Sequence, residues 1–291
     1  MAGDGRGEYG ILRVQELPDP GWDERWDGIV VPDEVKERLL NYALFLQLGR
    51  GQTTQVRLPI HGMILLEGPP GTGKTTLARG LANQAARVLQ EEFGVKSAYC
   101  EVDAYRMASG LLGESQKHVE RLFYRSIPNL AKTYEHLTVL LDEVENIAVS
   151  REQASLNANP VDVHRATNAL LTGMDYVGEN HPNVLLVATT NFLETLDAAL
   201  LSRVDVRQPM RLPPPDTLAE IVLQTVADFA NVDDVSPEDR RRLGEALDGL
   251  DGRQARKNVL EAIITSREVA LKPGLLDVDR LIRGIANAPD A

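Results

Sequence analysis

Residues 68–75 read GPPGTGKT and fit the pattern G-x-x-x-x-G-K-[ST] at every fixed position. The apolar run Met63–Glu67 precedes this stretch, and a helix predicted from Lys74 to about residue 93 follows it. In such a strand–loop–helix setting, glycines let successive backbone N–H groups turn toward phosphate oxygens, and the helix N-terminus adds its positive dipole end. Lys74 is placed to bridge the β- and γ-phosphates, and the Thr75 hydroxyl to ligate Mg²⁺. The stretch therefore predicts an ATP site, to which we assign Gly68, Pro69, Pro70, Gly71, Thr72, Gly73, Lys74, Thr75 and Thr76.

Two acidic residues supply the other half of the predicted chemistry. The β-rich run Leu137–Leu141 ends in Asp142 and Glu143. Asp142 is placed to hold Mg²⁺, often through water, and Glu143 to activate the attacking water as a general base. Asn191 ends a further apolar run, where a neutral amide is placed to orient that water. The presence of Glu143 argues against a nucleotide binder that cannot hydrolyse.

Two arginines are candidates for contact with the γ-phosphate. Arg203 follows a short predicted helix and lies far from the phosphate loop in chain order. It is therefore expected to reach the nucleotide of a neighbouring subunit, which requires a ring; the alternative is an arginine in a surface ion pair. Arg253 opens a helix after Gly252 and is expected to sense the γ-phosphate. Arg256, three residues later on the same helical face, is its competitor.

Apolar runs alternate with helical segments along most of the chain. Runs are predicted at residues 63–67, 98–102, 137–141 and 184–188, closing near 206–212, with helices at 33–48, 74–93, 114–125 and 163–177. This order predicts an α/β fold with a parallel sheet covered on both faces. Pro213-Pro214-Pro215 then interrupts the pattern, and the remaining segments are helical in pattern. We predict a flexible N-terminal arm over residues 1–25, a large α/β domain over 26–213 and a small all-helical lid over 214–291.

Composition limits the classes of partner. The chain has 291 residues and a formal net charge of -12, which disfavours nucleic acid as a partner. No apolar run reaches the ~18 residues that a membrane span needs, and no secretory signal is evident. With one cysteine, no internal disulfide is possible, and the cytoplasm is the expected compartment. The five histidines lack metal-ligand spacing, so Mg²⁺ is the only metal expected.

Taken together, the phosphate loop, the acidic strand end, the TTN segment at 189–191, the Arg203 edge and a GxxGR segment resemble the AAA+ ATPases. A narrower resemblance, to the pachytene-checkpoint type that remodels HORMA-domain proteins, rests on WDGIV at 26–30, LDEVE at 141–145, VHRATNALLT at 163–172, LSRVDVRQ at 201–208 and LDGRQARK at 250–257. This resemblance covers about residues 26–285. It implies ATP with Mg²⁺ bound between a large domain and a lid, a homohexameric ring and a HORMA-domain substrate. Within these segments, Ile29 and Val30 are also expected to contact the nucleotide.

The sequence departs from that family in two places. The eukaryotic members carry a sizeable N-terminal domain, whereas about 25 residues precede Trp26 here, which fits a compact prokaryotic form. The family's central-pore loop carries a bulky aromatic residue, whereas residues 109–115 read SGLLGES and offer Leu111 and Leu112 for gripping the substrate. Because leucines lack an aromatic's large rigid face, local remodelling is expected rather than strong processive translocation. Ordinary packing at a helix start is the alternative for both leucines.

The leading hypothesis is an ATP-driven remodeller that controls a HORMA-linked anti-phage second-messenger system by disassembling the activated HORMA complex. A nucleic-acid-handling AAA+ ATPase, of the clamp-loader or helicase-loader type, is the main alternative, and DNA-stimulated ATP hydrolysis would favour it. A nucleotide-gated scaffold that does not turn over is the third reading, and Glu143, Asn191 and Arg203 argue against it.

Overall fold

The computed structural model describes residues 10–23, 26, 28–49, 60–107, 114–150, 160–227, 229–230 and 235–287. Its contacts divide the chain into two compact units. The first comprises Met1–Gly68 with Lys74–Pro209, and the second comprises Pro69–Gly73 with Met210–Ala291. The boundary between the two units, after Pro209, lies close to the domain boundary predicted after residue 213.

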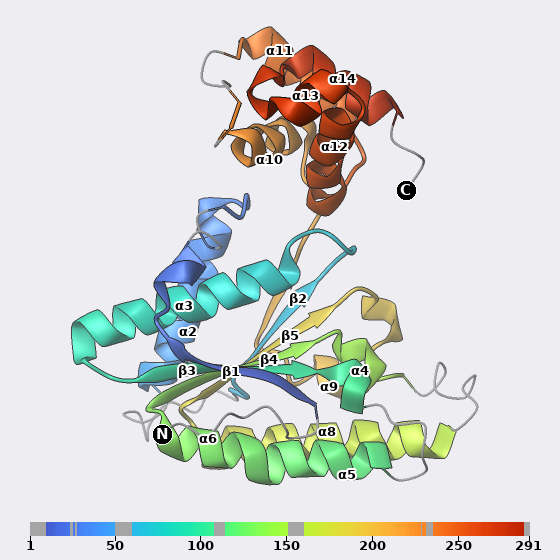
Figure 1. Cartoon of the computed structure of the whole chain (residues 1–291). Coiled ribbons are helices and arrows are strands. Elements are labelled where there is room, and N and C mark those ends of the chain that lie inside the picture. Colours follow the sequence, from blue (N-terminus) through green and yellow to red (C-terminus); the bar gives the residue numbers. More distant parts are fainter. Residues whose placement is uncertain are drawn as a thin grey trace. The chain divides into compact units, whose positions relative to one another are not determined.

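The first unit is built on a six-stranded sheet with the order β1-β3-β4-β5-β2-β6 (Figure 1). Its strands are β1 (Ile11–Leu17), β2 (Met63–Glu67), β3 (Ser97–Asp103), β4 (His136–Asp142), β5 (Val184–Thr190) and β6 (Val206–Pro209). All neighbours from β3 to β6 pair in parallel, and β1 pairs antiparallel to β3 at the edge. The predicted parallel sheet is thus confirmed. Parallel pairing brings the C-terminal ends of β2, β4 and β5 to one edge, where ligands bind in open α/β sheets.

Helices cover both faces of this sheet (Figure 1). On one side lie α2 (Asp33–Gly49) and α3 (Lys74–Phe93); on the other lie α5 (Glu114–Arg121), α6 (Ile127–Thr133) and α8 (Pro160–Asn180). Because strand side chains alternate between faces, Leu65, Val139 and Leu186 share one core with Phe123 and Met174 from the α5–α8 layer. Short helices α4 (Ala104–Met107) and α9 (Ala198–Leu201) and the 3₁₀ turns η1 (Pro20–Trp22), η3 (Val144–Asn146) and η4 (Leu193–Thr195) complete the unit.

The prediction of a flexible arm over residues 1–25 is wrong for residues 10–23, which the structure describes. Strand β1 pairs with β3 from Ile11 opposite Val102 to Leu17 opposite Ser97. Trp22 then packs edge-on against Tyr99 of β3, with ring centroids 5.0 Å apart. Backbone pairing and this buried aromatic contact order a segment whose polar composition had suggested an arm.

The helix predicted over 114–125 also differs from the structure. After α5 the chain forms a π-helical turn, η2 (Leu122–Ser126), and continues directly into α6. Pro128 lies in the first turn of α6, where its missing N–H costs little. Gly173 of α8 faces Phe123 of this turn so closely that a Cβ on Gly173 would lie 2.6 Å from the Phe123 side chain. The two helices therefore depend on glycine at this crossing.

The second unit is helical, as predicted. It contains α10 (Pro215–Val226), α11 (Pro237–Leu247), α12 (Gly252–Ile264), α13 (Arg267–Leu271), a 3₁₀ turn η5 (Pro273–Leu275) and α14 (Val278–Asn287). Pro215 occupies the first position of α10, so the triproline segment leads directly into a helix of the second unit. A core that includes Leu218, Leu243 and Val259 holds these helices together.

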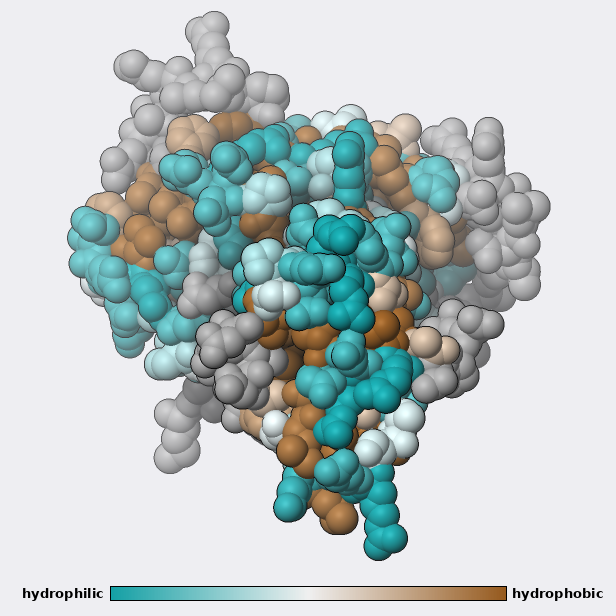
Figure 2. All heavy atoms as spheres, turned by 90° about the horizontal axis from the view of Figure 1, so that it is seen from above, coloured by the Kyte–Doolittle hydropathy of each residue, from teal (hydrophilic) through white to brown (hydrophobic). Residues whose placement is uncertain are grey.

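Figure 2 shows the face seen from above, on which patches of hydrophobic residues lie between hydrophilic ones. Leu260 and Ile264, one turn apart on α12, are 57% and 58% exposed. No helix in the described part of the chain has the length and apolar composition needed to cross a lipid bilayer.

Candidate nucleotide-binding and hydrolysis site

The phosphate loop joins β2 to α3, as its sequence predicts. Gly68, Gly71 and Gly73 have φ angles of 144°, 76° and 88°, which residues with side chains rarely adopt. Lys74 is buried at the start of α3, and its Nζ donates to the Gly68 carbonyl at 2.6 Å. The loop therefore has the glycine-dependent backbone, and the lysine at its base, that phosphate binding requires.

A chain of hydrogen bonds joins the metal-binding candidates to the predicted base. The Thr75 hydroxyl donates to Asp142 Oδ1 at 3.0 Å, and the Thr189 hydroxyl donates to the same oxygen at 2.6 Å. The Thr189 oxygen in turn accepts from the backbone N–H of Glu143 at 2.9 Å. The start of α3 and the C-terminal ends of β4 and β5 thus meet in one polar network. Thr189 therefore links the candidate metal ligand Asp142 to the predicted general base Glu143.

Glu143 has an unusual backbone conformation. Its φ and ψ are 53° and 54°, and it is the only non-glycine residue with positive φ among those the structure describes. For a residue with a side chain this left-handed conformation costs about 1–2 kcal/mol. The Asn146 side chain helps to hold it by donating to the Glu143 carbonyl at 3.1 Å. A strained acidic residue at a strand end is typical of a functional position.

Asn191 is fixed between Lys74 and Glu145. Its Oδ1 accepts from Lys74 Nζ at 2.9 Å, while its backbone N–H and Nδ2 donate to Glu145 Oε1 at 3.0 and 3.2 Å. Glu145 therefore determines which atom of the amide faces the lysine. The structure brings Asn191 to the phosphate loop, where the sequence predicts a water-orienting residue.

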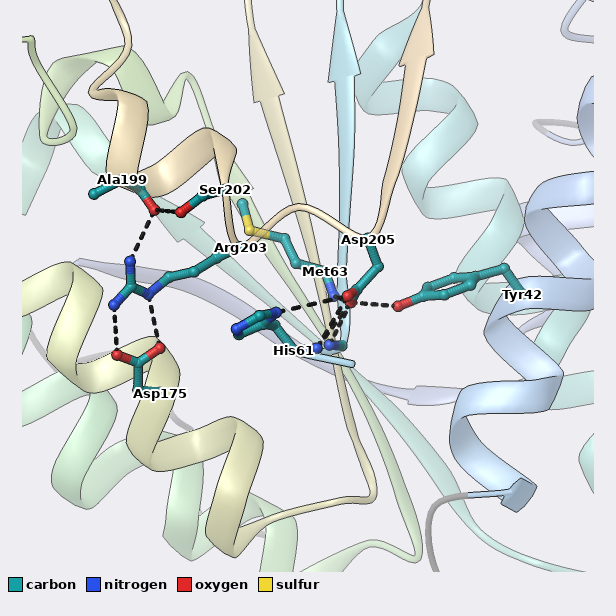
Figure 3. A network of polar contacts seen from close by, with 9 residues as sticks. Tyr42, His61, Met63, Asp175, Ala199, Ser202, Arg203 and Asp205 are labelled. Atoms are coloured by element: carbon teal, nitrogen blue, oxygen red, sulfur yellow. Dashed lines mark hydrogen bonds and ion pairs between the residues drawn. The ribbon is translucent and has the colours of Figure 1, made fainter. Parts of the chain in front are cut away.

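Arg203 forms an ion pair within its own subunit (Figure 3). Its Nε and Nη2 donate to the two oxygens of Asp175 in α8, both at 2.7 Å, and its Nη1 donates to the Ala199 carbonyl at 2.8 Å. The guanidinium lowers the pKa of Asp175 chiefly by hydrogen bonding, and Asp175 raises the pKa of Arg203 in the same way. The ion pair that the sequence left as an alternative is present; a role toward a neighbour's nucleotide stays a prediction.

The hydrogen bonds described above do not involve the remaining predicted residues, some of which lie outside the described part of the chain. Ile29 is buried and Val30 is half-buried ahead of α2, and Thr76 is exposed on α3. Arg253 is exposed at the start of α12, in the second unit. The predicted pore residues Leu111 and Leu112 lie outside the residues that the structure describes.

Sequence reasoning missed three supporting residues: Thr189, Glu145 and Asp175. Thr189 and Glu145 fall inside the quoted TTN and LDEVE segments, but residue type and spacing there do not indicate their roles. Asp175 lies on α8 beyond any motif, and no sequence signal pairs it with Arg203.

The polar groups of the site suit a magnesium–triphosphate complex. Mg²⁺ prefers hard oxygen ligands and keeps several sites for water and phosphate oxygens. The Thr75 hydroxyl and the Asp142 carboxylate provide such oxygens 3.0 Å apart, close to the phosphate loop. Within the described ranges no three His, Cys, Asp or Glu side chains gather into a metal cluster. These two oxygens would therefore hold Mg²⁺ together with water and phosphate oxygens rather than through protein ligands alone.

Comparisons with known proteins find relatives that align with most of the chain. The chain is 40% identical to CD-NTase-associated protein 6 of Pseudomonas aeruginosa over 285 residues, 96% of this chain and 92% of that protein. It is 31% identical to the putative pachytene checkpoint protein 2 of Caenorhabditis elegans over 234 residues, 79% of this chain and 54% of that protein. The chain thus spans about half the length of this nematode relative.

Solved structures show the same fold. The "Structure of C. elegans PCH-2" matches with a TM-score of 0.77 and 24% identity, covering 95% of this chain and 74% of that one. A chain of the "Structure of E. coli MS115-1 HORMA:CdnC:Trip13 complex" matches with a TM-score of 0.79 and 19% identity, covering 98% and 97%. The family model described as "ATPase family associated with various cellular activities (AAA)" matches residues 64–212, which include the phosphate loop, the acidic pair and Arg203. This chain therefore belongs to the AAA ATPase family, in the group that contains CD-NTase-associated protein 6 and the pachytene checkpoint proteins.

Proposed function

We propose that this chain is an ATP-driven remodeller that works as a homohexameric ring and partly unfolds HORMA-domain signalling proteins. In doing so it would regulate an anti-phage second-messenger system by disassembling the activated HORMA complex. The observation that carries the proposal is the network joining Thr75, Asp142, Thr189 and Glu143 beside Lys74. Such a network suits ATP hydrolysis, because a site that only bound nucleotide would not need a general base held in a strained conformation.

Each residue of the site has a distinct part in the proposed reaction. Lys74 neutralises charge on the phosphates, and Thr75 and Asp142 would hold Mg²⁺, which supplies charge stabilisation at the phosphate oxygens. Glu143 takes a proton from the attacking water, and Asn191 orients that water. Arg203 of the adjacent subunit would stabilise the charge that develops on the γ-phosphoryl group.

The partner class comes from the relatives. CD-NTase-associated protein 6, which aligns with 96% of this chain, is named for association with a CD-NTase. The structural neighbour of the same fold was solved in a complex with HORMA and CdnC. These names supply the protein class to test, and the net charge of -12 is compatible with a protein client rather than nucleic acid.

A trapped complex tests the proposal. Glu143→Gln removes the base but keeps the nucleotide-binding groups, so with ATP it should form a stable ring that retains its client. Lys74→Ala, which weakens nucleotide binding, is the matched control and should retain nothing. We expect a HORMA-domain protein to co-purify with the Glu143→Gln ring in ATP. A ring that never assembles with saturating ATP and Mg²⁺, or that retains DNA in preference to protein, would overturn the proposal.

A further inference from the structure

Arg203 and Asp205 lie two residues apart in the connection from α9 to β6, and their side chains reach different partners (Figure 3). Arg203 points toward α8, where Asp175 binds it with both carboxylate oxygens. Asp205 points toward the start of β2 and toward Tyr42 of α2. The connection is therefore tied to two different parts of the first unit.

Asp205 anchors the backbone from which Arg203 projects. Its carboxylate accepts the backbone N–H groups of His61, Gly62 and Met63 at 3.0, 2.6 and 2.9 Å and the Tyr42 hydroxyl at 2.7 Å. The side chain is 11% exposed, so these bonds lie largely out of solvent. On the other side, the Arg203 backbone N–H donates to the Leu200 carbonyl of α9 at 2.9 Å. The position of the Arg203 Cα is thus determined from both sides.

Asp175 then determines the orientation of the guanidinium. The group is planar and carries five N–H donors. Three of them bind Asp175 and the Ala199 carbonyl, which fixes the plane of the group. In the described part of the chain the other two donors, one on each terminal nitrogen, have no partner. The Arg203 side chain is 23% exposed, so it is held but not enclosed.

We propose that Asp175 is a positioning residue for Arg203 and holds its two remaining N–H donors ready for the triphosphate bound in the adjacent subunit. This inference rests on the proposed function, because it needs a ring in which Arg203 acts on a neighbour. A bidentate carboxylate suits this task, since it fixes the guanidinium plane while leaving the outer edge of the group able to bind phosphate. An ion pair that served only to stabilise the fold would have no effect across the subunit boundary.

Rings assembled from two different variants distinguish a positioning role of Asp175 from a role in stabilising the fold alone. Asp175→Ala should lower kcat about tenfold, because a misaligned arginine loses part of its contribution, while ATP binding and ring assembly stay unchanged. Asp175→Asn keeps the size of the side chain and one acceptor oxygen, so it should fold and lose less activity. Lys74→Ala subunits cannot hydrolyse ATP but carry an intact Asp175–Arg203 pair. When they are mixed with Asp175→Ala subunits, hydrolysis per Asp175→Ala subunit should recover, because its neighbour now supplies a positioned arginine.

The control variant breaks a comparable ion pair elsewhere. Glu101 of β3 binds Arg79 of α3 through both oxygens, and Glu101→Gln should destabilise the unit without lowering kcat of the folded ring.

Adding Asp175→Ala to Arg203→Ala should lower kcat no further. If Arg203→Ala alone leaves kcat unchanged, the inter-subunit site of the proposed function fails. A different result would contradict only the present inference. In that case Arg203→Ala lowers kcat and Lys74→Ala subunits restore hydrolysis, whereas the two Asp175 variants either keep full activity or are not restored by Lys74→Ala subunits.

Discussion

Replacing Thr189 with valine would remove one hydroxyl and keep the shape and strand preference of the side chain. Thr189 is buried, with 1% of its surface exposed. Its hydroxyl accepts a hydrogen bond from the Glu143 N–H and donates one to Asp142 Oδ1. Losing a hydrogen bond to the Asp142 carboxylate and leaving the partly buried Glu143 N–H without its partner should together cost about 3 kcal/mol of network stability. If about 2 kcal/mol of this appears in the transition state, kcat should fall about 30-fold.

Steady-state hydrolysis measured together with nucleotide binding would separate the two effects. Because Lys74 and the glycines of the loop are untouched, the Kd for ATP should change little while kcat falls. Thr138→Val is the matched control: Thr138 lies in β4, is 4% exposed, and its hydroxyl makes no hydrogen bond among the described residues. The control should bind and hydrolyse ATP like the unmodified protein.

The reasoning would be refuted by a Thr189→Val protein that hydrolyses ATP at the unmodified rate. It would also be refuted if Thr138→Val lost as much activity as Thr189→Val, since burial of a threonine rather than the bridge would then explain the loss.

Three further predictions concern other parts of the first unit. Glu145→Ala should lower kcat about tenfold at unchanged ATP affinity, because the Asn191 amide loses the carboxylate that orients it; unchanged kcat would remove Glu145 from the site. Tyr42→Phe should lower the free energy of unfolding, measured in urea, by about 2 kcal/mol through loss of one bond to Asp205, and a change near zero would contradict this. Burial lowers the pKa of His136, so the unfolded chain takes up a proton first and stability should fall as the pH drops below about 6.5. In His136→Gln this dependence, followed by urea unfolding between pH 8 and pH 5, should be weaker; an equal dependence would assign it elsewhere.

The bounds of β2 and α3 could be predicted well because the phosphate loop lies between them. The strand must end where the loop begins, and the helix must begin where the loop's lysine lies, so Met63–Glu67 and Lys74–Phe93 match the prediction. Strand β1 could not be predicted, because only its end residues are buried and its remaining side chains are polar or partly exposed. An edge strand of this kind is held by backbone pairing with β3, which leaves little trace in hydrophobic periodicity.

Within the site, the residues expected to contact ATP, Mg²⁺ or water could be predicted from the sequence. The residues that hold them in position could not. Lys74, Thr75, Asp142 and Glu143 belong to patterns in which residue type and spacing carry the chemistry. Thr189 depends on the register between β4 and β5, which pairs Leu141 with Ala188 and so brings the next residues together. Asp175 depends on the direction in which one side chain leaves α8. Neither register nor side-chain direction follows from the order of residues alone.

The proposed coupling of ATP hydrolysis to remodelling can be measured in one reaction. A complex of a HORMA-domain protein with its CdnC-type partner, labelled for fluorescence, would be mixed with the ring and ATP while phosphate release and complex dissociation are recorded together. We predict that dissociation rises in proportion to the ATP hydrolysed and stops with Glu143→Gln. Hydrolysis without dissociation, or dissociation that is as fast with Glu143→Gln, would contradict this account.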